Sequence, residues 1–219
     1  MVERELIVGP TPLFIFDAPA AGTGKGLLAE TLGIAVYGAP PGVMNDTRAE
    51  EEMRKRITSA LREGLPVIQI DNVGKRIASE TLAAALTSTV WVDRLLGNND
   101  LVRVPNRALW LATGNNIELS NEIARRGVWV RLDARVDRPW ERDGFRHRYL
   151  GLWVREHRHE LVWALLVLCA NWLAEGRPAN RGLDAHGPGD RHRWHPAGPG
   201  AGDRPGGEPL DPDRSRRPL

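Results

Sequence analysis

The sequence predicts a three-layer α/β fold, in which a parallel sheet lies between helices and a short helical segment follows it. Apolar runs alternate with stretches of helical periodicity, which is the pattern of parallel strands joined by helices. A glycine-rich loop follows the first apolar run, and later runs end in polar residues such as Asp71 and Asn115. Polar residues at the carboxyl ends of buried strands are typical of the ligand-binding edge of an open α/β sheet.

The first apolar run, residues 13–16, leads into a loop with the composition of a phosphate-binding site. The glycine-rich stretch ends at Lys25, and helical periodicity resumes at Leu27. Backbone N–H groups of such a loop and the positive end of the next helix form a nest for anions, and Lys25 would reach the β- and γ-phosphates of a nucleotide. The residues expected to bind the nucleotide are Ala21, Gly22, Thr23, Gly24, Lys25, Gly26 and Leu27.

The loop departs from the pattern G-x-x-x-x-G-K-[ST] at two positions. Pro19 stands where the first glycine belongs, and Gly26 replaces the hydroxyl residue that normally contacts Mg²⁺. We expect phosphate binding to tolerate these changes better than metal placement does. The alternative interpretation is an ordinary glycine turn with a surface lysine.

After the loop helix, the apolar run 34–37 is expected to be a strand. Residues 47–62 are expected to form a helix that Thr47 and Glu50 begin as a capping box and that Gly64 ends. Its charged side chains are expected to pair on a solvated face: Glu50 with Arg54, Glu51 with Lys55 and Glu52 with Arg56.

Residues 66–72 predict a buried parallel strand that presents Asp71 at its carboxyl end. Together with the phosphate loop, this strand resembles a Walker B motif, whose acid holds Mg²⁺ through water. The following residue is usually a glutamate that polarises the attacking water. Asn72 stands there instead, and because an amide cannot act as a base, efficient hydrolysis would need another carboxylate.

The next elements are a short helix over 79–88 and two β-like runs that are expected to form a hairpin around the turn 97–100. The hairpin carries Arg94, Arg103 and Arg107, which either contact a nucleic-acid backbone or are simply exposed.

Three further elements complete the predicted core. Residues 109–116 predict a third buried strand, 119–126 a short helix capped by Ser120, and 128–132 a last strand.

In this order, the elements resemble the core of an AAA+ ATPase of the helicase-like branch, which includes superfamily 3 helicases and the primase-helicases of phages and integrative elements. The resemblance covers residues 10–135. It implies a P-loop NTPase fold, ATP and Mg²⁺ as cofactors, and a homo-oligomeric ring such as a hexamer that acts on DNA.

The resemblance also implies roles by position. Residues 22–25 correspond to the P-loop, Asp71 to the Walker B acid that holds Mg²⁺ through water, and Asn115 to the sensor 1 residue near the γ-phosphate. Arg126, or alternatively Arg125, corresponds to the arginine finger that enters the neighbouring subunit's site. The alternative for this arginine pair is a cation at a helix C-terminus, which the helix dipole favours.

Residues 149–175 predict one or two helices, where AAA+ proteins begin a helical lid. We therefore expect an ATPase core in 1–135, a lid-like segment in 136–176 and a tail in 177–219. The Pro-, Gly- and Arg-rich tail is expected to be disordered, either as a genuine flexible tail or as a frameshifted reading.

Composition predicts a cytoplasmic protein without membrane association. The net charge of +2 lies entirely in 177–219, so it says little about nucleic-acid binding. The single Cys169 excludes an intramolecular disulfide and is expected to be a buried thiol. The longest apolar run, 161–170, falls far short of the roughly 20 residues of a membrane span, and no secretory signal is visible.

The leading hypothesis is an ATP-binding module that drives a mobile-element DNA helicase or primase-helicase. The alternative is a degenerate, truncated remnant that binds ATP, hydrolyses it poorly and acts as a nucleotide-gated binding module. A small-molecule P-loop kinase is a third possibility, and it would not need Asn115 or the arginine pair. Because the phosphate-loop strand starts so near Met1, we expect the chain to be part of a longer protein.

Overall fold

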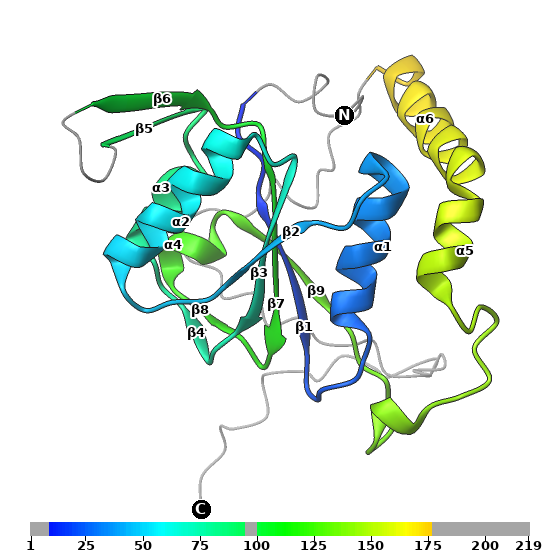
Figure 1. Ribbon diagram of the computed structural model, residues 1–219. Coiled ribbons are helices and arrows are strands. Elements are labelled where there is room, and N and C mark those ends of the chain that lie inside the picture. The colour runs from blue at the N-terminus through cyan, green and yellow to red at the C-terminus, as the bar shows by residue number, and fades with distance from the viewer. Residues whose placement is uncertain (1–8, 95–99, 177–219) are drawn as a thin grey trace, which may run out of the picture. The chain divides into compact units, whose positions relative to one another are not determined.

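The structure is a computed structural model that describes residues 9–94 and 100–176 (Figure 1). The predicted tail and most of the predicted hairpin turn lie outside these residues. The strands are β1 (Leu13–Ala18), β2 (Gly42–Asn45), β3 (Val67–Val73), β4 (Arg76–Ile77), β5 (Val90–Arg94), β6 (Leu101–Pro105), β7 (Leu109–Asn115), β8 (Glu118–Leu119) and β9 (Gly127–Arg131). The helices are α1 (Lys25–Tyr37), α2 (Glu50–Glu63), α3 (Glu80–Ala85), α4 (Asn121–Ala124), η2 (Pro139–Glu141), α5 (Leu150–Glu156) and α6 (Arg158–Ala174).

Five parallel strands form the central sheet in the order β2-β3-β7-β1-β9. In the middle of the sheet, Leu13 of β1 lies opposite Trp110 of β7 and Gly127 of β9. Parallel strands share one carboxyl edge, so the polar ends of β1, β3 and β7 meet there. The predicted α/β fold with a parallel sheet is confirmed.

Helices cover both faces of the sheet. Leu13 and Ile15 pack with Met53 of α2 on one face, whereas Phe16 packs with Ala29 of α1 on the other. Figure 1 shows α1 on one side of the strands and α2, α3 and α4 on the opposite side. Alternate side chains of a strand point to opposite faces, so each buried strand contributes to both cores and the fold has three layers.

The predicted strand at 34–37 is wrong. These residues form the last turns of α1, where Ile34 and Ala35 pack on Val154 of α5. A short apolar run fits a buried helix as well as a strand, and here the run continues the phase of α1. Gly38, with a φ of 82°, ends the helix, and the second strand is β2.

The predicted start of the second helix is also wrong, since α2 begins at Glu50 and its cap position has no side-chain hydrogen bond. The Glu50 carboxylate instead accepts hydrogen bonds from the Ser79 hydroxyl and the Thr81 N–H, both at 3.0 Å, at the start of α3. Arg54 pairs with Asp93 of the hairpin at 2.9 Å and not with Glu50. The other two predicted pairs form: Glu51 with Lys55 and Glu52 with Arg56, each at 2.8 Å.

The hairpin prediction is confirmed, since β5 and β6 pair antiparallel. One side packs on α2, where the Trp91 indole N–H donates to the Thr58 hydroxyl at 2.8 Å. Arg94 and Arg103 lie on its exposed side. The hairpin leads directly into the amino end of β7, so it lies at the edge of the sheet opposite the ends of β1, β3 and β7.

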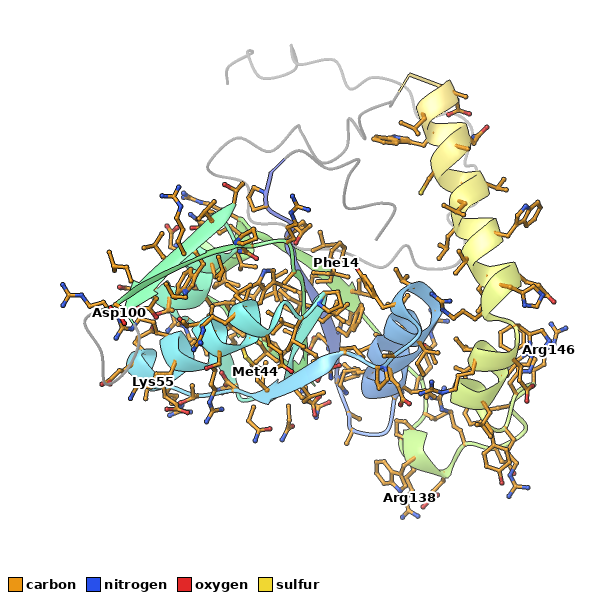
Figure 2. The ribbon with its side chains drawn as sticks, turned by 45° about the horizontal axis from the view of Figure 1, so that its top comes forward. Phe14, Met44, Lys55, Asp100, Arg138 and Arg146 are labelled. Carbon is orange, nitrogen blue, oxygen red and sulfur yellow. The ribbon has the colours of Figure 1, made fainter. Side chains whose placement is uncertain are left out.

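The C-terminal residues, expected to form one or two helices, form two, and α5 and the start of α6 pack on α1. The Arg158 guanidinium donates to the Ile34 carbonyl at 3.1 Å and the Val36 carbonyl at 3.0 Å, which satisfies the last turn of α1. No residue of α6 is buried, and its side chains project in all directions (Figure 2). Cys169, expected to be buried, is therefore only half-buried. None of the helices in the described part of the chain has the length and hydrophobicity of a membrane span.

Candidate functional site

The loop between β1 and α1 has the backbone conformation of an anion nest. Gly22 and Gly24 have φ values of 72° and 98°, in the left-handed region that glycine adopts without strain. Within α1, the first amide to donate is that of Leu28, which bonds the Gly24 carbonyl at 2.8 Å. The N–H groups before it have no partner within the helix, and such groups bind phosphate.

Lys25 lies under this loop and is only 8% exposed. Its Nζ donates to Asn115 Oδ1 at 2.6 Å, and more weakly to the Thr23 hydroxyl at 3.3 Å and the Ala20 carbonyl at 3.4 Å. Burial lowers the pKa of Lys25, and the nearby Asp17 carboxylate opposes that shift. The structure therefore brings Lys25 and Asn115 into direct contact across 90 residues of sequence.

Polar side chains form a row on the α1 side of the sheet. Gln69 and Asp71 come from β3, and Thr113 and Asn115 from β7, at alternate positions that share one face. Asp71 Oδ1 accepts hydrogen bonds from the Thr113 hydroxyl and, at 3.1 Å, from the Gln69 amide. The row ends at Lys25, whose pKa the negative charge of Asp71 raises. Sequence reasoning missed Gln69 and Thr113, although each lies two residues before a predicted site residue.

Asn72 lies where β3 shifts its register against β7. Its φ of 49° is left-handed, its N–H donates to the Thr113 hydroxyl at 3.3 Å, and its side chain is exposed. The local backbone is thus held in place, and the residue after Asp71 supplies no carboxylate. Two nearby carboxylates, Asp17 and Asp71, raise the pKa of Lys25 and so oppose the effect of its burial.

A second network, which sequence reasoning missed, holds the start of the loop. Asp17 is fully buried and accepts hydrogen bonds from Arg131 of β9 and from the Ile117 N–H, the latter at 3.0 Å. Arg131 also donates to Asn116 Oδ1 at 3.3 Å, and Asn116 donates to the Pro19 carbonyl at 3.1 Å. The network joins the carboxyl ends of β1, β7 and β9, and an acid at the end of an apolar run was its signal in the sequence.

The arginine pair lies at the opposite edge of the sheet. The Arg126 carbonyl accepts from the N–H of Leu13 at the amino end of β1, whereas Lys25 follows the carboxyl end, about 20 Å away for a strand of this length. The Arg126 guanidinium bonds the carboxylate and carbonyl of Glu122, four residues earlier, while Arg125 is exposed. Neither arginine can therefore reach the loop of its own chain.

Mg²⁺ fits this site through Asp71 and water. Asp71 Oδ2 accepts no hydrogen bond within the described part of the chain, so it is open to a water of the hydrated ion, which Mg²⁺ usually retains. Gly26 offers no hydroxyl. Among the described residues, no group of three or more His, Cys, Asp or Glu side chains could hold a metal ion directly.

Neither a protein-family model nor a curated protein matches this chain. Among solved structures, it is similar to the A form apo structure of the NrS-1 C-terminal region, with 14% identity, a TM-score of 0.46 and coverage of 67% of this chain and 34% of that one. It is also similar to the JCV helicase, with 12% identity, a TM-score of 0.41 and coverage of 59% and 37%. The chain thus spans little more than a third of either structure's length. Similarities of this size assign no chemistry to the chain, so the chemistry has to come from the site's own residues.

Proposed function

We propose that this chain is the nucleotide-binding core of an AAA+-type ATPase of the helicase-like branch, with ATP as its nucleotide. The observation that carries the proposal is the convergence of Lys25, Asn115 and Asp71 at one edge of the sheet, beside a loop with left-handed glycines and the amino end of α1. A cation, an amide and a carboxylate arranged in this way suit a polyphosphate that carries Mg²⁺.

The residues have separate tasks in this proposal. The Lys25 ammonium exchanges its bond to Asn115 for the β- and γ-phosphates, which relieves the cost of its burial. Asn115, once released, is positioned to orient a water near the γ-phosphate. Asp71 would hold Mg²⁺ through water, and the ion would neutralise phosphate charge.

Arg126 is proposed to act in a neighbouring subunit. Because it lies at the edge of the sheet away from Lys25 of its own chain, a role as an arginine finger needs a ring or filament of copies. In such an assembly Arg126 would have to exchange Glu122 for a phosphate. DNA is the proposed partner, and the exposed hairpin residues Arg94 and Arg103 suit its backbone.

Asn72 favours a second candidate function, a module that binds ATP and hydrolyses it slowly. Asp17 and Asp71 are the carboxylates that raise the pKa of Lys25. Asp17 is fully buried and accepts two hydrogen bonds, and the open oxygen of Asp71 is the one that would face the water shell of Mg²⁺. A general base needs an available carboxylate close to the water it activates. In this alternative, ATP occupancy alone would change the affinity for the partner.

The test is equilibrium binding of labelled ATP to the wild type and to Lys25→Ala, with Lys75→Ala as a control for loss of an exposed lysine. We expect Lys25→Ala to abolish binding, because it removes the buried cation of the site, and Lys75→Ala to change nothing. Turnover with and without DNA then separates the motor from the slow module. Unchanged ATP binding by Lys25→Ala would place the nucleotide elsewhere and end the proposal.

A further inference from the structure

The segment 132–149, which we name the strap, runs from β9 to α5 and touches the phosphate loop at Gly22. A Cβ atom added to Gly22 would lie 2.7 Å from Cβ of Trp140 and 3.0 Å from its Cα and N. Contacts that short require a glycine, so the loop and the strap main chain are closely packed. Figure 1 shows the turn of η2 beside the connection from β1 to α1.

One hydrogen bond links the strap to the loop, and a second, within the strap, holds the residue that makes it. The Arg142 guanidinium donates to the Thr23 carbonyl of the loop at 3.4 Å and, through Nε, to the Pro139 carbonyl at 3.1 Å. Pro139 itself is buried at the start of η2. Trp140 lies between these two anchor points, so its main chain is fixed at the rim of the loop.

The Trp140 indole takes no part in this anchoring. The residue is 60% exposed, and its ring makes no hydrogen bond or ring contact among the described residues. Figure 2 shows the side chain of Arg138, at the start of η2, pointing away from the sheet. A large flat apolar side chain is thus available at the rim while the backbone does the packing.

A nucleotide whose phosphates occupy the loop leaves its base at the rim, because ribose and base extend out of the nest. At the other end of the loop, Leu27 in the first turn of α1 is 45% exposed and offers an aliphatic surface. Every nucleobase has a flat π-face, so any base can stack on an aromatic side chain. The geometry points to Trp140 as the residue on which the nucleobase of the bound nucleotide stacks, an inference that rests on the proposed nucleotide binding.

The test compares a ligand that has a base with one that has none. Dissociation constants for ATP and for inorganic tripolyphosphate are measured on the wild type, Trp140→Ala and Trp140→Phe. Trp163→Ala, which removes a similarly exposed indole from α6, is the matched control. We expect Trp140→Ala to bind ATP roughly 5- to 150-fold more weakly, the range for loss of one base–aromatic stack, and tripolyphosphate as the wild type does. Trp140→Phe should retain most of the ATP affinity.

Two outcomes overturn the inference. An equal loss for ATP and tripolyphosphate would make Trp140 a brace for the loop, and no loss for either ligand would place the base elsewhere. Lys25→Ala, measured in parallel, keeps the two proposals distinct. If it loses both ligands while Trp140→Ala loses neither, nucleotide binding stands and only the stacking role fails.

Discussion

Replacing Arg131 by methionine should destabilise the protein far more than the same replacement of an ordinary surface arginine would. The change keeps the apolar stem but leaves the fully buried Asp17 carboxylate with one donor, the Ile117 N–H. Removing one partner of a buried ion pair costs about 3–5 kcal/mol. The Arg131 side chain is 42% exposed, so water can replace part of the lost interaction, and we expect a loss of about 2–3 kcal/mol.

Denaturant titration measures this loss, and thermal unfolding should show a fall of about 5–10 °C for a domain of this size. Arg138→Met is the control, since its partner Glu141 lies at 3.1 Å and both side chains are more than half exposed; such pairs contribute at most about 1 kcal/mol. Asp17→Asn combined with Arg131→Met should cost less than the sum of the single changes. Equal losses for Arg131→Met and Arg138→Met would refute the assigned role of the network.

Two further predictions concern turnover. Asn72→Glu places a carboxylate after Asp71 and should raise ATP hydrolysis by up to about 10²-fold, whereas Asn72→Gln should not; equal rates for the two variants would show that the missing base does not limit the reaction. Arg126→Ala should retain ATP affinity but lose roughly 10³- to 10⁵-fold in turnover, the range for an arginine finger, and mixing it with Lys25→Ala should restore part of the activity. If both variants assemble and no mixture regains turnover, Arg126 is the helix-end cation that its bond to Glu122 suggests.

The sequence predicted elements best where a single local pattern decided them. β1, β3, β7 and β9 follow from apolar runs with polar ends, and the helix cap at Ser120 is confirmed by its hydrogen bond to the Ile123 N–H. The strand predicted at 34–37 was wrong because packing against α5 decided between helix and strand there, and no local pattern contains that information. The capping box predicted with Glu50 was wrong for a similar reason. The groups that Glu50 binds, the Ser79 hydroxyl and the Thr81 N–H, lie at the start of α3, 29 and 31 residues further along the chain.

In the candidate site too, residues in local motifs could be predicted and long-range pairs could not. Lys25, Asp71 and Asn115 each lie in a recognisable motif, and the sheet order brings them together as predicted. The pair of Asp17 and Arg131 is 114 residues apart in sequence and depends on β9 being the neighbour of β1. Asp17 at the end of an apolar run is a local signal, but the strand order is needed to identify Arg131 as its partner.

The row of polar side chains on β3 and β7 would make the proposed nucleotide binding a reporter of strand register. Thr113 and Asn115 face α1 only when β7 pairs with β1 as Leu13 with Trp110. A slip of one residue would turn both into the apolar core beneath α2 and point Trp110 toward α1. These parallel pairings join segments nearly 100 residues apart, and such contacts form slowly. A chain that has collapsed with misaligned strands would therefore be compact and helical but would lack the proposed nucleotide site. If the proposal holds, nucleotide capture would count correctly folded molecules that circular dichroism alone cannot distinguish.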